Sequence, residues 1–186
     1  MDNHIGKGTY LIANPHGTDQ NFMKTVVLIC DHNKNGTFGL ILNKTINLAE
    51  AHSITTETHL PDIKEYFFGG PVDTSKLFCL HGSKMNHVCS CGKICDGVHL
   101  LSSQDCLDSL LAEKNSETPF RLYLGCACWS PGQLEDEIKM NFWTTGPANH
   151  NIVFYPNPDK IWWYILRFIS NYDPESPFNP SLPVLN

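Results

Sequence analysis

Hydrophobic and polar positions change their period near residue 130, where an extended apolar run gives way to a helical pattern. The segment 120–124 is mostly apolar, aromatic and β-favouring, which predicts a buried strand. Gly125 is predicted to end this strand, where the backbone bends or passes close to a neighbour. Leu134, Ile138 and Phe142 then recur every fourth residue, which predicts an amphipathic helix with these side chains in the core. The pattern therefore predicts a strand that turns sharply into a helix.

The start of this helix has its own sequence signal. Ser130 is predicted as the N-cap, Pro131 as the first helical residue and Gln133 as the third. In this arrangement, the side chains of Ser130 and Gln133 form a reciprocal capping box.

Three polar residues, Gln133, Glu137 and Asn141, follow the border of the apolar stripe at the same spacing. They are predicted to be partly buried and to need hydrogen-bond partners. The favoured interpretation is that they bind the backbone of neighbouring loops. An alternative uses the helix N-terminus beside Trp129 and Gly132, where unpaired N–H groups could hold an anion or a carboxylate. The charge of Glu137 would oppose a strongly anionic ligand.

The rest of the chain mixes strands and helices without a regular βαβ alternation, which predicts an α+β domain with a largely antiparallel or mixed sheet. Thr25–Cys30 is predicted as a strand covered on both faces, and it forms a central hairpin with Phe38–Leu42. The Gly-Gly-Pro sequence at residues 69–71 is interpreted as a tight turn rather than a phosphate loop. The other predicted elements are helices at 47–52, 103–111 and 157–169, and strands at 8–15 (stopped by its proline), 66–72, 77–81 and 151–155.

Composition and charge limit the function classes. The 186 residues carry a net charge of −6, and the 13 basic residues are scattered, which argues against a nucleic-acid-binding surface. The apolar runs are too short to span a bilayer, and the amino terminus lacks a secretory signal, so the protein is predicted to be cytoplasmic without a membrane partner. Residues 1–172 are predicted as one domain and residues 173–186 as a proline-rich tail.

The eight cysteines are predicted to be thiols, and Cys30, Cys79 and Cys106 to be buried. A second group, Cys89, Cys91, Cys95 and His99, with His81 or His87 as a spare, offers the ligand types that zinc prefers. The C-x-C-x-x-x-C spacing is unlike that of structural zinc sites, and in one extended strand Cys95 and His99 would lie about 13 Å apart. The sequence therefore predicts neither a metal nor another cofactor.

Three patches of the chain resemble the AlgH-like (YqgE) family, and together they extend to about residue 154. The first resembles the family's strand, His-containing turn and Gly-Leu-x-x-Asn motif, and the second its Gly-Gly-Pro-Val turn. The third resembles the signature Gly-Tyr-Ala-Gly-Trp-x-x-Gly-Gln-Leu-x-x-Glu. The residues concerned are Phe22, 26–28, His32, Gly36 and 39–44; 69–72, Leu80 and His81; and Gly125, Ala127, Trp129, 132–135, Glu137, Asn141 and Trp143. Cys126 and Cys128 stand where the family usually has Tyr and Gly, so neither inherits a role.

The resemblance implies one domain with a strongly curved, barrel-like sheet flanked by helices, and it carries the family's label of transcriptional regulator. No helix-turn-helix can be placed in this acidic chain, so an effect on transcription would run through a protein or small-molecule partner. We therefore favour a non-catalytic binding or regulatory module. The candidate binding residues are Trp129, Ser130, Gly132, Gln133, Glu137, His32 and Asn43.

Two of these candidates have simpler structural interpretations. His32 is interpreted as a turn residue that bonds local backbone, and Asn43 as a cap of the next segment. The alternative function is a thiol-dependent enzyme that uses Cys126 or Cys128 near a helix N-terminus, where the helix dipole lowers a thiol pKa. It would need His32, His81 or His150 as a base, provided that the fold brings one of them within reach.

Overall fold

Strand β9 (Phe120–Trp129) lies at the centre of the sheet and organises the molecule. The computed structural model describes residues 5–15, 22–55, 60–82, 92–101, 104–112 and 118–169. The other strands are β1 (Thr9–Ala13), β2 (Val26–Asn33), β3 (Gly36–Ile41), β4 (Thr45–Ile46), β5 (Tyr66–Phe68), β6 (Val72–His81), β7 (Gly92–Cys95), β8 (Val98–Leu100) and β10 (Trp143–Pro147). The helices are α1 (Leu48–Ile54), α2 (Gln104–Ala112), α3 (Gln133–Lys139), α4 (His150–Val153) and α5 (Pro158–Ile169).

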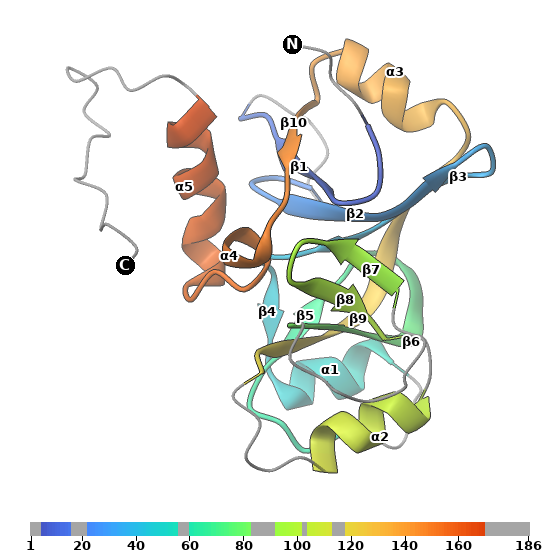
Figure 1. The fold of residues 1–186 in the computed structure, drawn as a ribbon, viewed down its shortest axis with the longest axis vertical. Coiled ribbons are helices and arrows are strands. Elements are labelled where there is room, and N and C mark those ends of the chain that lie inside the picture. The colour runs from blue at the N-terminus through green and yellow to red at the C-terminus, as the bar shows by residue number, and fades with distance from the viewer. Residues whose placement is uncertain are drawn as a thin grey trace.

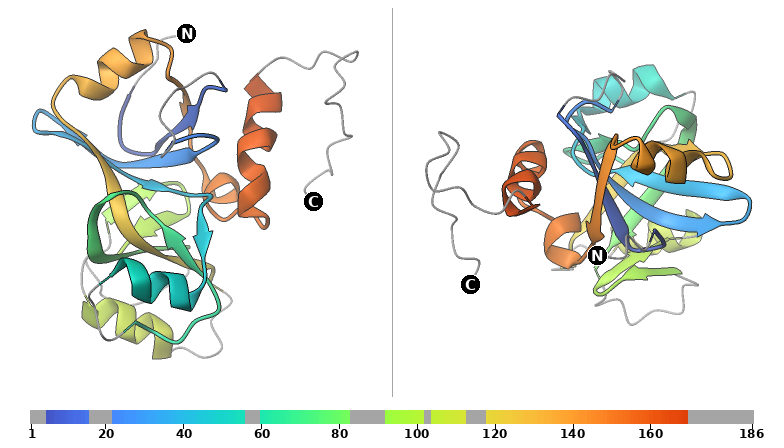
Figure 2. Two further views of the ribbon diagram at one scale, coloured as in Figure 1. Left: turned by 180° about the vertical axis from the view of Figure 1, so that it is seen from behind. Right: turned by 90° about the horizontal axis from the view of Figure 1, so that it is seen from above.

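The strands form one sheet in the order β10-β1-β2-β3-β9-β6-β8-β7, and the short pair β4 and β5 joins it at β9. All neighbours are antiparallel except β5 and β9, which run parallel. The sheet curls into an antiparallel half-barrel, and β9 runs from the end of the molecule covered by α1 and α2 to the end that holds β1–β3 (Figures 1 and 2). This architecture confirms the predicted α+β class with a curved sheet.

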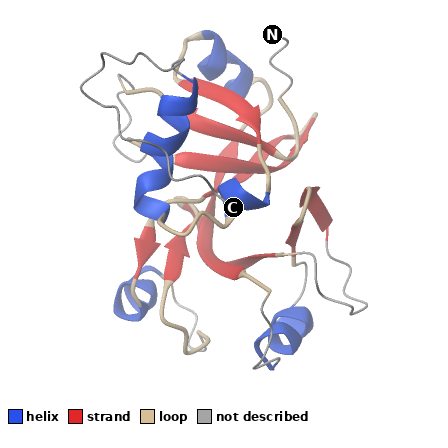
Figure 3. Cartoon of the chain, turned by 60° about the vertical axis from the view of Figure 1, so that its left-hand side comes forward, coloured by secondary structure: helices blue, strands red, loops and turns tan. Residues whose placement is uncertain are grey.

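The helices lie outside the strands (Figure 3), and they pack on three clusters of the core. Helix α3 contributes Leu134 to a cluster with β1, β2 and β10, whereas α5 contributes Ile161, Trp162 and Ile165 to a second cluster. Helices α1 and α2 pack on a third cluster, which includes Tyr66. Trp162 also donates from Nε1 to the carbonyl of Ala13 at 2.8 Å, which ties α5 to β1.

Several local predictions are confirmed. Val26–Cys30 is buried along its whole length and pairs with β3 in the predicted hairpin. The three predicted helices appear as α1, α2 and α5, and α1 begins with a capping box between Asn47 and Glu50. Among the described residues, no helix is long and apolar enough to cross a membrane. The predicted tail, 173–186, lies outside the described residues, so the boundary at 172 stays a prediction.

Two predictions near the C-terminal end of the described chain are wrong. The predicted strand at 151–155 is instead helix α4, because the Asn149 side chain caps it by accepting from the Ile152 N–H. The strand of this region is β10, which the sequence did not indicate; it pairs with β1 along five residues. The apolar residues of α4 follow a short helical turn, which a run of five residues does not distinguish from a strand.

Gly125 was predicted to end this strand. The prediction is wrong, because β9 continues to Trp129. The predicted close approach of the backbone is present: a Cβ atom on Gly125 would lie 2.3 Å from the Gly70 carbonyl oxygen. Gly125 has a φ of 68°, a left-handed conformation that side chains with a Cβ rarely adopt. The strand thus bends at this point and passes on to pair with β3.

Candidate functional site

The turn before α3 differs from the predicted capping box. The helix begins at Gln133, and its N-cap is Gly132, with a φ of 80° and no side-chain cap. Ser130 is therefore not the N-cap, because residues 130–132 form a separate turn in which the Gln133 N–H donates to the Ser130 carbonyl at 3.0 Å. Half of the predicted box is present, since Gln133 Oε1 accepts from the Ser130 N–H at 3.0 Å.

The side chain of Glu137 is the centre of a hydrogen-bond network on α3. Its Oε2 atom accepts from the indole N–H of Trp129 at 2.8 Å and from that of Trp143 at 2.7 Å. Its Oε1 atom accepts from Gln133 Nε2 at 2.9 Å. The favoured interpretation, in which Gln133, Glu137 and Asn141 bind loop backbone, is thus wrong for Glu137, whose partners are side chains.

A pocket of about 190 Å³ opens beside this carboxylate; we call it the Glu137 pocket. Its walls come from β1, the turn at 22–24, the end of β9, α3 and the start of β10. The rings of Trp129 and Trp143 stand nearly perpendicular, with centroids 6.0 Å apart, and Phe22 packs against both. The lining residues are Ala13, Asn14, Phe22, Met23, Cys128, Trp129, Gln133, Glu137, Phe142 and Trp143.

Polar contacts hold two walls of the pocket in place. Asn43, which was predicted to cap the segment after it, instead accepts from the Val26 N–H and donates to the Lys24 carbonyl, each at 2.8 Å. These bonds fix the turn that carries Phe22 and Met23. On the opposite side, Asn14 donates to Asn141 Oδ1 at 3.0 Å and fixes the loop that follows α3.

The predicted binding residues have different places in this arrangement. Trp129, Gln133 and Glu137 line the pocket, whereas Ser130 and Gly132 form the turn before α3. His32 does not line the pocket. Its Nδ1 atom lies 2.7 Å from Thr37 Oγ1, so its partner is a side chain rather than the predicted backbone, and its Nε2 atom lies 3.6 Å from Glu135 Oε1.

Six lining residues were not predicted as site residues: Ala13, Asn14, Phe22, Met23, Phe142 and Trp143. Phe142 was predicted to lie in the core on the apolar stripe of α3. It is 41% exposed, because α3 ends at Lys139 and Asn141 adopts a φ of 61°. The helical spacing could not reveal this early end. Trp143 is part of the family resemblance, which was the available signal for it.

The geometry of the two β9 thiols opposes the predicted enzyme. Cys126 lies in the strand and not at a helix N-terminus, and burial raises its pKa to about 12. A thiol with this pKa is protonated at neutral pH and is a poor nucleophile. Cys128 is exposed and lines the Glu137 pocket. Among the described contacts, neither thiol bonds to a histidine, and their partners are each other and the Val72 carbonyl.

The predicted zinc-like group lies partly outside the described residues, which include neither His87, Cys89 nor Cys91. The sequence-based distance placed Cys95 and His99 in one extended strand. In the structure they lie on the two arms of the β7–β8 hairpin. In the described part of the chain, no group of three or more side chains could hold a metal ion. Cys30, Cys79 and Cys95 are thiols, but Cys106 is in a disulfide, so the prediction of eight thiols is wrong.

His81 is stacked on His99, with ring centroids 5.4 Å apart. His81 Nδ1 lies 2.7 Å from the Gly82 carbonyl, and among the described residues its Nε2 atom has no hydrogen-bond partner. Burial lowers the pKa of His81, and the neighbouring His99 adds to this effect, although the Gly82 carbonyl partly opposes it. His81 is therefore neutral in the folded protein at pH 7.

We expect acid to destabilise the protein through His81. Its pKa is lower when folded, so the unfolded chain binds more protons below about pH 6.5, and stability falls as the pH drops. A His81→Asn variant should lose less unfolding free energy between pH 7 and pH 5 than the wild type in urea titrations. The control, His52→Asn, changes an exposed histidine on α1 and should keep the wild-type slope. Equal slopes for all three proteins would contradict this assignment.

Comparison with known proteins places this site in a family context. Similar proteins include the UPF0301 protein of Chlamydia muridarum, 33% identical over 88% of this chain and 86% of the relative. The UPF0301 protein of Paraburkholderia phymatum is 37% identical over 78% of each chain. Among solved structures, the AlgH protein of Pseudomonas aeruginosa is 30% identical and matches with a TM-score of 0.72 over 96% of this chain and 95% of its own. A protein of Corynebacterium diphtheriae with 22% identity shares the fold, with a TM-score of 0.71 over 89% of this chain and 88% of its own.

A comparison with sequence models of protein families also identifies the AlgH-like family. The sequence model of the AlgH-like family matches residues 10–171, which contain the whole Glu137 pocket. This match agrees with the three sequence patches that resemble the family. The chain therefore belongs to the AlgH-like family.

Proposed function

We propose that this protein is a non-catalytic binding module whose Glu137 pocket takes the positively charged side chain of a partner protein. The observation that carries this proposal is the uncompensated carboxylate in an aromatic pocket. All three groups that donate to Glu137 are neutral, and no lysine, arginine or histidine is among the described residues that line the pocket. A cationic group would supply the missing charge.

The shape and walls of the pocket support the same ligand class. A volume of about 190 Å³ is smaller than the roughly 300–1,000 Å³ of common small-molecule sites, so it suits one side chain better than a nucleotide. The rings of Trp129, Trp143 and Phe22 attract cations, because the face of an aromatic ring is electron-rich. Met23 and Phe142 are exposed at the pocket and can pack on the aliphatic stem of lysine or arginine.

A regulatory role would follow from binding a protein rather than DNA. The net charge of −6 repels nucleic acid and favours a basic partner surface. The proposed location is the cytoplasm, where thiols such as those of Cys30 and Cys79 stay reduced. The disulfide at Cys106 argues against this location, and non-reducing peptide mapping of protein isolated from its own cells will test it.

The binding proposal can be tested with amino-acid probes. Nα-acetyl-arginine amide and Nα-acetyl-lysine amide should shift the indole N–H resonances of Trp129 and Trp143 in a saturable manner. The neutral Nα-acetyl-norleucine amide and the acidic Nα-acetyl-glutamate amide should shift them far less, because neither is cationic. The tryptophans of α5, Trp162 and Trp163, serve as internal references.

A matched pair of variants tests the role of the carboxylate. We expect Glu137→Gln to weaken the binding of the arginine probe by about tenfold, which corresponds to about 1.4 kcal/mol. Glu135→Gln removes the same charge from the same helix at a residue that contacts His32 and lies outside the pocket, and it should change binding less than twofold. Equal effects of the two variants, or equal shifts from the norleucine probe, would refute the proposed site.

A further inference from the structure

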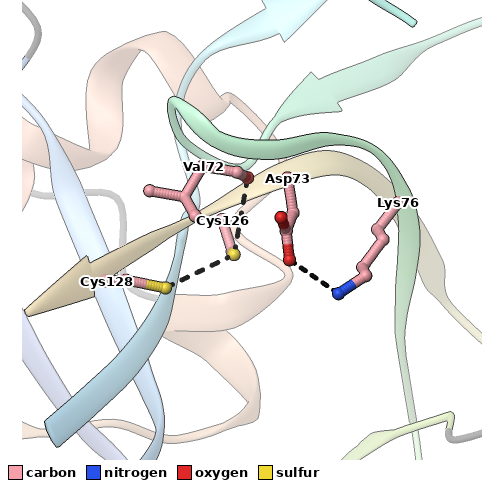
Figure 4. A network of polar contacts seen from close by, with 5 residues as sticks. All are labelled: Val72, Asp73, Lys76, Cys126 and Cys128. Carbon is pink, nitrogen blue, oxygen red and sulfur yellow. Dashed lines mark hydrogen bonds and ion pairs between the residues drawn. The ribbon is translucent and has the colours of Figure 1, made fainter. Parts of the chain in front are cut away.

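Strand β9 brings two thiols together beside the Glu137 pocket. Cys126 and Cys128 are two residues apart, so both side chains leave the same face of the strand. Their Sγ atoms lie 3.6 Å apart, with Val72 and the ion pair of Asp73 with Lys76 close by (Figure 4). Neither thiol belongs to the hydrogen-bond network of Glu137.

The two thiols differ in access to solvent. Cys126 is 3% exposed and donates to the Val72 carbonyl at 3.5 Å, whereas Cys128 is exposed. Burial raises the pKa of Cys126 to about 12, so its thiol is not the first to react with a dissolved oxidant. An oxidant from solution therefore meets Cys128 first and finds the second thiol next to it.

The backbone permits a bond between the two sulfurs. Residues two apart in a strand have Cα atoms about 6.6 Å apart, which lies near the upper end of the range of about 4.4–6.8 Å seen in disulfides. Next to this segment, the pairing of β9 with β6 is irregular, with a register shift between Val72 and Leu77. Beyond Cys126, the paired neighbour of β9 is β3. A disulfide at the long end of the range is strained and easily reduced.

We propose that Cys126 and Cys128 are a redox-active thiol pair that closes to a reversible disulfide by exchange with a small-molecule disulfide such as glutathione disulfide. The Cys128 thiolate attacks one sulfur of the oxidant, whose S–S bond breaks and releases one glutathione. Cys126 then attacks Cys128 Sγ, its proton passes to the departing glutathione sulfur, and the second glutathione leaves as a thiol. In total, two protein thiols are oxidised and one glutathione disulfide is reduced to two thiols.

The sequence makes this proposal easy to measure. Trypsin cleaves after Arg121 and after Lys139, so one peptide, residues 122–139, contains both thiols and no other cysteine. The native full-length protein is incubated with millimolar glutathione disulfide, quenched with acid, denatured and alkylated. We expect this peptide to lose two hydrogens and to take up no alkylating agent, and an excess of dithiothreitol should reverse the change. The peptides that contain Cys30 and Cys79 should remain fully alkylated, because both residues are buried.

Two variants distinguish the attack of Cys128 on glutathione disulfide from the later attack of Cys126 on Cys128. In Cys126→Ser, Cys128 should retain one bound glutathione, because no neighbouring thiol displaces it. In Cys128→Ser, the peptide should stay unmodified, since Cys126 is shielded. The proposal is overturned if the wild-type peptide ends as a lasting glutathione adduct with Cys126 still alkylated, or if it stays fully reduced. The binding of arginine probes to the Glu137 pocket is measured separately, so either proposal can fail without the other.

Discussion

A Gly125→Ala variant should lose about 3 kcal/mol or more of unfolding free energy. Its φ of 68° is a left-handed conformation, which costs a residue with a Cβ about 1–2 kcal/mol. The new Cβ would also lie 2.3 Å from the Gly70 carbonyl oxygen and 3.0 Å from that of Val72, and overpacking of this kind costs about 1–3 kcal/mol. Both clashing atoms belong to the backbone, so no side-chain rotation relieves them. Urea unfolding followed by circular dichroism measures the loss.

The control for this experiment is Gly132→Ala. Gly132 also has a left-handed conformation, with a φ of 80°, but no atom of the described residues lies within 4 Å of the position of its Cβ. Only the conformational cost remains, so we expect a loss of about 1 kcal/mol. A Gly125→Ala variant as stable as Gly132→Ala would show that β9 and the turn at Gly70 can move apart. In that case, the close approach would not shape the bend of β9.

A Glu137→Leu variant should be destabilised by about 2–4 kcal/mol. The carboxylate accepts from the indole N–H groups of both Trp129 and Trp143, whose side chains are each only 5% exposed. Each buried donor left without an acceptor costs about 1–3 kcal/mol, and water entering the pocket offsets part of this cost. The measurement is again urea unfolding by circular dichroism, because the substitution itself alters tryptophan fluorescence.

Two further variants test the reason for this loss. Glu137→Gln keeps an oxygen that can accept from both indoles, so it should lose less stability than Glu137→Leu. Glu135→Leu removes a carboxylate of the same helix that lies 3.6 Å from His32 Nε2, and it should cost less than about 1 kcal/mol. If Glu137→Leu unfolds at the same urea concentration as Glu135→Leu, the network does not stabilise the fold. The pocket would then be formed by aromatic packing alone.

Local signals explain which elements could be predicted. The hairpin of β2 and β3 has a continuous apolar run on each side of an Asn-Gly turn, and α5 combines a Pro start with apolar residues at helical spacing. In each case, residues close in sequence determine the element. Strand β10 gave no such signal, because Trp-Thr-Thr-Gly-Pro is neither alternating nor continuously apolar, and its stability comes from pairing with β1, 130 or more residues away.

The sequence by itself determined the α+β class, the apolar face of α3 with Leu134 and Ile138, and the presence of Trp129, Gln133 and Glu137 at the turn into that helix. These features depend on spacing within a few residues. Only the tertiary structure decided that Glu137 binds two indoles, one from β9 and one from β10. It also decided that Asn43 supports the turn of Phe22 and that Cys128 lines the Glu137 pocket. The reason is that the partners of a partly buried polar group come from whichever strands the curled sheet brings together, and no local pattern records them.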